Sequence, residues 1–277
     1  MCTIPVLRRV CRESYNDPLA VYEKLKRAGM DLVTVTDHDS IDAVEALRSR
    51  PDFFLSEEVT CKLPSGTEMH VGVYDITERD HVELQRRRDD FESLFAWLVD
   101  HNLFFSANHV FSRLTGRRAD ADFELFATAF PAVETHNGHM LAIANAGAAR
   151  LADWAARAEI GGSDAHAMAS VGSAWTTVPG ARNRQEYLDG LRSGLGRVRG
   201  ESGGVYKLTR DLLAIGREMM REDPRTLPLV ALGALVPLVT LGNYVLEYFF
   251  ARSWAASNLR ARKLNQAAVR IAEVMAC

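Results

Sequence analysis

The chain has 277 residues, which is enough to bury a large core as one or two domains. Hydrophobic residues make up 47% of the chain and charged residues 25%, the ordinary composition of a globular protein. The formal net charge of −3 excludes an overall basic field, and we find no strong nucleic-acid-binding signature. Four scattered cysteines form no CxxC pair, which argues against a zinc ribbon or a disulfide framework and favours a reducing, cytoplasmic compartment.

Strands and helices alternate along most of the chain. The predicted elements are, in order, a helix at 17–30, a strand at 31–37, a helix at 40–49, a β-hairpin at 53–76, a helix at 78–101, a strand at 103–108, a helix at 123–129, a strand at 132–135, a helix at 140–157, strands at 159–161 and 173–178, and a helix at 184–193. This alternation predicts an α/β fold with a largely parallel sheet, and polar residues at the strand ends favour a barrel-like arrangement.

The sequence changes character after the glycine-rich stretch 200–204, where strand signals end. We therefore divide the chain into a domain at 1–200 and a helical extension at 201–277. The extension contains an apolar segment, 227–246, that has no charged side chain and is long enough to cross a bilayer. Arginines flank both ends, which fits attachment to the inner face of a membrane through a hairpin broken at Pro237. The alternative is a helix pair buried against the domain or against another subunit.

Five of the eight histidines directly follow or lie within predicted strands: His38, His70, His109, His136 and His166. A single histidine at a strand end is most often a surface or hydrogen-bonded residue. The C-terminal ends of parallel strands meet at one face, however, so these imidazoles should gather near carboxylates such as Glu58. A mixed set of imidazole and carboxylate ligands suits divalent zinc, manganese or iron.

Six short motifs occur in an order that resembles the PHP family, the polymerase and histidinol phosphatase domain. The motifs lie at 29–40, 57–60, 69–72, 107–109, 133–138 and 162–166. The resemblance implies a distorted (β/α)7 barrel, here followed by the C-terminal helical extension. It also implies one to three divalent metal ions and phosphoesterase activity.

The resemblance further implies roles for individual residues. The expected metal ligands are His38, Glu58 as a bridging carboxylate, His70, His109, Asp164 and His166. Three of these are also expected to act in catalysis: His38, Asp164 and His166. Three further residues are expected to support the ligands from behind: Asp37, Asp39 and His136. For Asp39 a helix cap, and for His136 a purely structural role, are the alternatives.

The opening motif of the family, a His-x-His at the end of the first strand, has no counterpart in this sequence. No histidine precedes His38, and the motif should fall near residues 8–11, which read Arg-Arg-Val-Cys. Either the motif lies upstream of Met1 or the site has lost it. A guanidinium group cannot bind a cation, whereas Cys11 can supply a thiolate.

The predicted function is metal-assisted hydrolysis of a small phosphorylated substrate or nucleotide. A bound ion lowers the pKa of its water from about 15.7 towards roughly 7. Arg113, Arg117 and Arg118, in the loop after His109, are candidates for holding the substrate phosphate, with a solvated surface loop as the alternative. The rival hypothesis is a PHP-like binding or scaffold module, attached to a membrane and without activity. The sequence predicts no particular oligomeric state.

Overall fold

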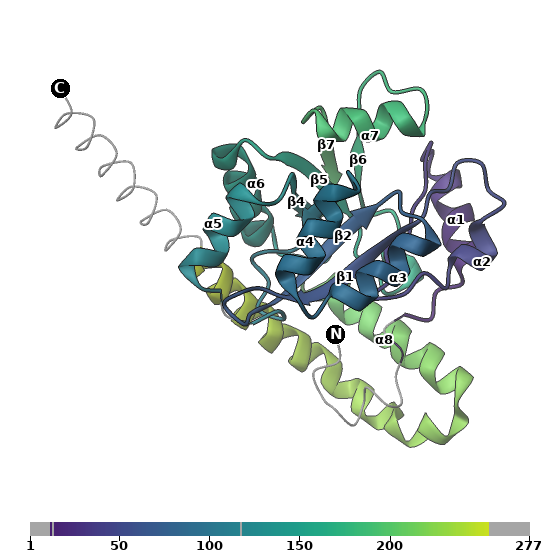
Figure 1. Ribbon diagram of the computed structural model, residues 1–277. Coiled ribbons are helices and arrows are strands. Elements are labelled where there is room, and N and C mark those ends of the chain that lie inside the picture. The colour runs from purple at the N-terminus through teal and green to yellow at the C-terminus, as the bar shows by residue number, and fades with distance from the viewer. Residues whose placement is uncertain (1–11, 13, 117, 255–277) are drawn as a thin grey trace, which may run out of the picture.

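Two β-sheets carry the polar motifs of the chain. The computed structural model describes residues 12, 14–116 and 118–254, and its strands are β1 (Ser56–Lys62), β2 (Glu68–Tyr74), β3 (Phe104–Ala107), β4 (Ala132–Asn137), β5 (Ala158–Gly162), β6 (Ala174–Thr177) and β7 (Arg197–Gly200). The first five form one sheet in chain order, and β6 pairs with β7 in a smaller sheet (Figure 1). Because β1, β2 and β3 run antiparallel and β3, β4 and β5 run parallel, the larger sheet is mixed.

The α/β class predicted from the alternation of strands and helices is confirmed, but closure of the sheet into a barrel is not detected among the described residues. The strand predicted at 31–37 makes only isolated parallel bridges, the last of them between His38 and Glu58. β5 and β6 also lack a strand ladder. The Thr176 hydroxyl of β6 instead bonds both backbone groups of Gly161 on β5: it accepts from Gly161 N at 2.8 Å and donates to Gly161 O at 2.9 Å.

Helices surround the sheets, and α1, α3, α4 and α7 begin at a polar residue whose side chain caps the helix. They are α1 (Pro18–Arg27), α2 (Val44–Leu47), α3 (Glu78–Arg87), α4 (Phe91–Asp100), α5 (Asp120–Thr128), α6 (Ala142–Ala155), α7 (Arg184–Arg192) and α8 (Val205–Glu222), with the 3-10 helices η2 (Met168–Ser170) and η3 (Pro224–Leu235). Asp17 caps α1 by accepting from Ala20 N at 2.8 Å. α3 and α4 replace the single helix predicted at 78–101, because Asp90 adopts extended backbone and caps α4 instead.

The larger sheet has one apolar face and one polar face because alternate side chains of a strand point to opposite sides. On β3, Phe105 packs into an apolar cluster with α3, α4, α5 and α6. Its neighbour Phe104 faces the other way and packs with Leu188 of α7. Phe104 and Leu188 line a cavity together with Glu58 and Glu134, so the polar motif residues emerge on the α7 side of the sheet.

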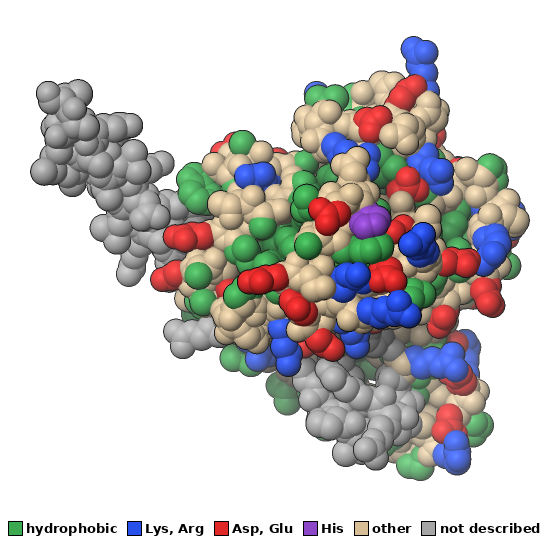
Figure 2. Space-filling view, viewed as in Figure 1, with side chains coloured by type: hydrophobic (Ala, Val, Ile, Leu, Met, Phe, Trp, Pro, Cys, Tyr) green, Lys and Arg blue, Asp and Glu red, His purple; other side chains and the backbone are tan. Residues whose placement is uncertain are grey.

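Aromatic rings fill the core beneath the strands. Phe130 is fully buried and makes edge-to-face contacts with Phe95, Phe105 and Phe126 at centroid separations of 4.9, 5.7 and 5.7 Å. Burying one such side chain stabilises the fold by about 1.5–3 kcal/mol, which gives the strand ends a rigid support. On the outer face of α3 and α4, acidic and basic side chains are interspersed (Figure 2).

After α8 the chain stays helical from Pro224 to Trp254, first as η3 and then as an α-helix over residues 236–254. The break predicted at Pro237 is therefore wrong. This proline is the second residue of the α-helical part, where a missing N–H costs little. The chain reverses at Asp223 instead, so that α8 and the following helix lie side by side (Figure 1). The division of the chain at residue 200 stays a prediction, and residues 255–277 lie outside the described residues.

Candidate metal centre

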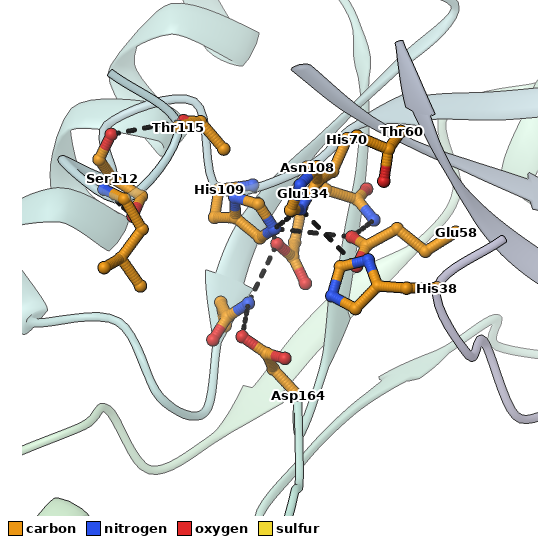
Figure 3. A network of polar contacts seen from close by, with 12 residues as sticks. His38, Glu58, Thr60, His70, Asn108, His109, Ser112, Thr115, Glu134 and Asp164 are labelled. Atoms are coloured by element: carbon orange, nitrogen blue, oxygen red, sulfur yellow. Dashed lines mark hydrogen bonds and ion pairs between the residues drawn. The ribbon is translucent and has the colours of Figure 1, made fainter. Parts of the chain in front are cut away.

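Glu58 on β1 is the centre of the candidate site. Its Oε2 lies 3.2 Å from His38 Nδ1 and 3.7 Å from His70 Nδ1, and its Oε1 lies 3.3 Å from His109 Nε2. The carboxylate and the His70 and His109 rings are buried, and His38 is half-buried at the edge. Three imidazoles from separate segments of the chain thus surround one carboxylate (Figure 3).

His38 reaches this carboxylate because its segment runs alongside β1. Asp39 N donates to Glu58 O at 2.9 Å, and Glu58 N donates to Asp37 O at 3.1 Å. Asp39 has a left-handed backbone, with φ of 54°, and its Oδ1 accepts from Thr60 N at 2.9 Å. Asp37 and Asp39 therefore fix the loop of His38, the first through its backbone and the second also through its side chain.

His70 and His109 come from neighbouring strands. His70 lies on β2 opposite Thr60, and His109 follows β3 with φ of 29°. The backbone N–H of His109 donates to Glu134 Oε2 at 2.9 Å, which holds this unusual turn in place. His70 Nδ1 and His109 Nε2 lie 3.1 Å apart, both facing Glu58.

The charges of this cluster depend on one another. Burial, together with the charge of His109, lowers the pKa of His70 to about 3, so His70 is neutral and can offer a lone pair. At His109 burial favours the neutral ring, but the hydrogen bond and charge of Glu58 outweigh it and raise the pKa to about 9. At Glu58 burial favours the neutral acid, yet the bond and charge of His109 lower its pKa. The buried carboxylate thus requires positive charge beside it, and a divalent cation meets the same requirement.

Amide side chains hold the carboxylates of the site. Asn108 Nδ2 donates to Glu58 Oε1 at 2.7 Å. Asn137 Nδ2 donates to Glu134 Oε2 at 3.0 Å and to Asp164 Oδ2 at 3.1 Å, so it links the end of β4 to the turn after β5. We did not predict roles for Glu134, Asn108 or Asn137. All three stand inside the motifs that we selected for their histidines or for Asp164, and that position was the available signal.

Glu134 is buried and Asp164 is half-buried, and the pKa values of their carboxyl groups shift in opposite directions. Burial raises the pKa of Glu134 to about 7; His109 opposes this shift and the charge of Asp164 adds to it. At Asp164 burial has the same tendency, but the nearby imidazoles, His166 first among them, outweigh it and lower the pKa. A carboxyl group that titrates near neutral pH is suited to accept and return a proton.

Asn137 occupies the position that we expected for His136. In a regular strand, Glu134 and His136 would point to the same face. The register between β4 and β5 shifts between these two residues, and such a bulge changes which later side chain faces the site. As a result, Asn137 contacts Glu134 and Asp164, whereas the buried Nε2 of His136 has no hydrogen-bond partner among the described residues.

The predicted ligands fall into three groups. His38, Glu58 and His70 offer ligand atoms that all lie within 4.8 Å of one another. His109 joins them through Glu58, and Asp164 faces the cluster from the other side of Asn137 (Figure 3). His166 lies at the cavity wall, where its Nδ1 donates to the Asp164 carbonyl at 2.9 Å and its ring stacks on His139.

Two of the three arginines that we predicted to bind phosphate, Arg113 and Arg118, donate to protein acceptors instead. Arg118 is buried, and its guanidinium donates to two backbone carbonyls and to Thr115 Oγ1. Arg113 donates to Asn243 Oδ1 on the C-terminal helix at 3.2 Å. Arg117 lies outside the described residues, as do residues 8–11, where the opening motif would fall. Neither Arg113 nor Arg118 lines the cavity, because their donors are directed to protein acceptors.

A cavity of about 690 Å³ opens beside the cluster. Its acidic lining residues are Asp37, Asp42, Glu58, Glu134 and Asp164, and among the described residues no lysine or arginine lines it. Apolar side chains also line the cavity, among them Leu25, Phe54, Phe104 and Leu188. The negative charge and the mixed imidazole and carboxylate donors fit a bound divalent cation.

Residues 142–195 match the model of a family described as PHP-associated, which confirms the resemblance predicted from the motifs. Among solved structures, the chain is similar to PsfC from Pseudomonas syringae, with 18% identity and a TM-score of 0.53, over 76% of this chain and 93% of that one. At this identity the similarity shows a shared fold. A "putative metal-dependent phosphoesterase" from Bifidobacterium adolescentis is also similar, with 13% identity and a TM-score of 0.43, over 56% and 84% of the two chains. No curated protein matches the sequence.

Proposed function

We propose that this chain, which carries a PHP-associated segment, hydrolyses phosphate esters with the help of one to three divalent ions of zinc, manganese or iron. The observation that carries the proposal is the convergence of His38, His70 and His109 on Glu58, at the edge of a cavity large enough for a small molecule. A site of this kind combines neutral nitrogen donors with ionised oxygen donors, which is the usual composition of hydrolytic metal sites.

The roles of the ligands follow from their placement. His38, Glu58 and His70 would hold one cation, and His109 and Asp164 would contribute to a neighbouring position, with Glu58 shared between the two. When bound, the cation supplies Lewis-acid activation of a water and neutralises phosphoryl charge. Asn108 and Asn137 orient the carboxylates through the amide hydrogen bonds described above, so that less reorganisation is needed when substrate binds.

Glu134 is the proposed proton acceptor of the reaction. His109 N and Asn137 Nδ2 both donate to its Oε2, which leaves Oε1 to take up a proton. Its raised pKa, about 7, lets it exchange that proton near neutral pH. His166, at the cavity wall beside Asp164, is positioned to return a proton to the leaving group.

The cavity lining indicates how a phosphorylated substrate would bind. Among the described residues it offers no cationic side chain, so the phosphate charge must be balanced by the bound ions. The apolar part of the lining, which includes Phe54, Phe104 and Leu188, suits a non-polar portion such as a nucleoside base. We therefore propose a small phosphorylated compound or a nucleotide as the substrate class.

Two substitutions test the proposal directly. His38→Ala removes one nitrogen donor, and Glu58→Gln keeps the shape of the side chain while removing its charge. We expect each purified full-length variant to lose bound metal in elemental analysis and to lose at least about 100-fold in hydrolysis of p-nitrophenyl phosphate with added Mn²⁺. His101→Ala is the matched control, because His101 is an exposed histidine at the end of α4.

The outcome of this test also separates the enzyme from its rival. Wild-type protein that retains no divalent ion and hydrolyses no phosphate ester would contradict the proposal and favour a PHP-like binding or scaffold module. Unchanged metal content in both His38→Ala and Glu58→Gln would instead refute the assignment of the site to these residues.

A further inference from the structure

The C-terminal helix leaves an apolar surface uncovered. Pro224–Trp254 is the one helix among the described residues that is long and apolar enough to cross a membrane, and 6% of its most apolar stretch is buried. The core helix of a soluble protein would be mostly buried, so packing within the described chain does not account for this composition. The outward side chains, each more than half exposed, include Leu227, Val230, Leu235, Leu238, Val239 and Phe249.

The opposite side of the same helix holds it against the body of the protein. Five residues spaced three or four apart share that side: Thr240, Asn243, Glu247, Ala251 and Trp254. The Thr240 hydroxyl lies 2.6 Å from the Thr209 hydroxyl of α8, and Glu247 accepts from Arg113 N at 3.0 Å. The helix therefore lies along the lower edge of the molecule (Figure 1), and its apolar side faces outward.

These contacts decide between lying on a bilayer and crossing it. To cross, the helix would have to give up its contacts with Arg113 and α8 and carry Thr240 and Asn243 into hydrocarbon, at a cost of roughly 2–7 kcal/mol for each polar group left unpaired. Lying flat keeps all of these contacts and places only the outward side chains in the acyl region.

The charge pattern fits a lipid surface with zwitterionic headgroups. Residues 226–246 contain no charged side chain, while Arg221, Glu222, Asp223 and Arg225 precede them and Glu247 and Arg252 follow. Arg221 pairs with Glu218 and Arg225 pairs with Asp223, so charges of both signs compensate one another at this end. An apolar face with charges of both signs at its ends matches acyl chains bordered by headgroups that carry both a phosphate and an ammonium group.

We propose that the helix Pro224–Trp254 docks in the plane of a lipid bilayer with zwitterionic headgroups, with Leu235, Leu238 and their outward neighbours in the acyl layer. This proposal goes beyond hydrolysis and does not depend on it. It also connects the bilayer to the metal centre, because Arg113, held by Asn243 and Glu247 of the helix, stands in the loop that follows His109.

Vesicle co-sedimentation of the full-length chain tests this docking. We expect binding to pure phosphatidylcholine vesicles that persists at high salt, because the apolar face of the helix supplies the contact. Leu235→Glu combined with Leu238→Glu should weaken binding at least about tenfold, because two apolar side chains no longer enter the acyl layer. Val99→Glu is the matched control: Val99 is an apolar residue, 65% exposed, on α4. Circular dichroism checks that each variant is folded.

Several results would overturn the proposal. Equal binding of the double variant and the wild type would show that this face is not the contact. Retention of the wild type in the membrane pellet at alkaline pH would indicate a crossing helix. A further result is a wild type that fails to bind vesicles and sediments as a dimer, while the double variant sediments as a monomer. That combination would assign the face to a second copy of the chain.

Discussion

At the scale of single residues, the site depends on how buried charges are compensated. An ionised carboxylate inside a protein is costly unless positive charge and hydrogen bonds surround it. Glu58 receives an amide hydrogen bond from Asn108 and lies within 3.7 Å of nitrogen atoms of three imidazoles. The arrangement is too specific to be needed for folding alone, since an apolar residue would fill the same space at less cost.

Asp39 offers a test of how the histidine loop is positioned. Its carboxylate accepts from Thr60 N and pairs with Arg88, so it fixes the turn that carries His38. Asp39→Ala should weaken the affinity for Mn²⁺ about 10–100-fold, as is typical when a residue that orients a ligand is lost. Isothermal titration measures this affinity, and Glu45→Ala, an exposed carboxylate on α2 outside the cavity lining, serves as the control. An unchanged affinity for Asp39→Ala would mean that the loop holds its shape without this carboxylate.

The sequence motifs predicted which histidines and carboxylates gather at one place better than they predicted the residues around them. His38, His70 and His109 could be chosen because they recur at strand ends. His81, which the helical pattern indicated to be solvated, instead lies 2.7 Å from the buried Glu57, because α3 packs its inner side on β1. Arg118 also reads as a loop cation, yet it is buried by contacts with segments distant in the sequence. Long-range packing of this kind leaves no local pattern.

At the scale of elements, α8 is held to the body by one buried ionic group. Asp211 accepts from His139 Nε2, from the Ser170 hydroxyl and from Arg210, and these partners link α8 to the loop after β4 and to η2. Burial alone would raise the pKa of Asp211, but its hydrogen bonds to these three residues lower it to about 2. The group is therefore ionised in the folded protein at any ordinary pH.

This depressed pKa predicts a pH-dependent anchor. The folded pKa lies below the unfolded value of about 3.9, so the stabilisation is fully present above pH 4 and is lost as the pH falls towards 2. At pH 7 Asp211→Asn should lower the free energy of unfolding by about 1–2 kcal/mol. Urea melts at pH 7 and pH 3 measure it, with the exposed Asp189→Asn as control. A deficit of Asp211→Asn that is as large at pH 3 as at pH 7 would contradict this account.

The boundaries of elements were predictable only where a local signal marks them. Asp17 and Pro18 are residues typical of a helix N-terminus, and α1 begins at Pro18 with Asp17 as its cap. The bulge between Glu134 and His136 has no glycine or other local marker, because the pairing of β4 with β5 produces it. The continuity of the helix at Pro237 could not be predicted either. A proline near the start of a helix and a proline that breaks a helix look the same in sequence.

At the scale of the whole molecule, the order of short motifs predicted an α/β fold and a common site. No motif predicted where the C-terminal helix would lie. The apolar composition of 227–246 indicated a buried or membrane-bound segment. The stripe from Thr240 to Trp254, which joins the helix to the body, depends on residues that are far apart in sequence, such as Arg113 and Phe123. The fold therefore places the apolar helix face and the metal centre on either side of the loop after His109.

The most direct test of the central claim is anomalous X-ray diffraction at the manganese edge from crystals of the full chain grown with Mn²⁺. We predict a peak at coordination distance, about 2.0–2.2 Å, from nitrogens of His38 and His70 and an oxygen of Glu58. Anomalous peaks confined to exposed carboxylates, with none inside this cluster, would contradict the assignment of these residues as metal ligands.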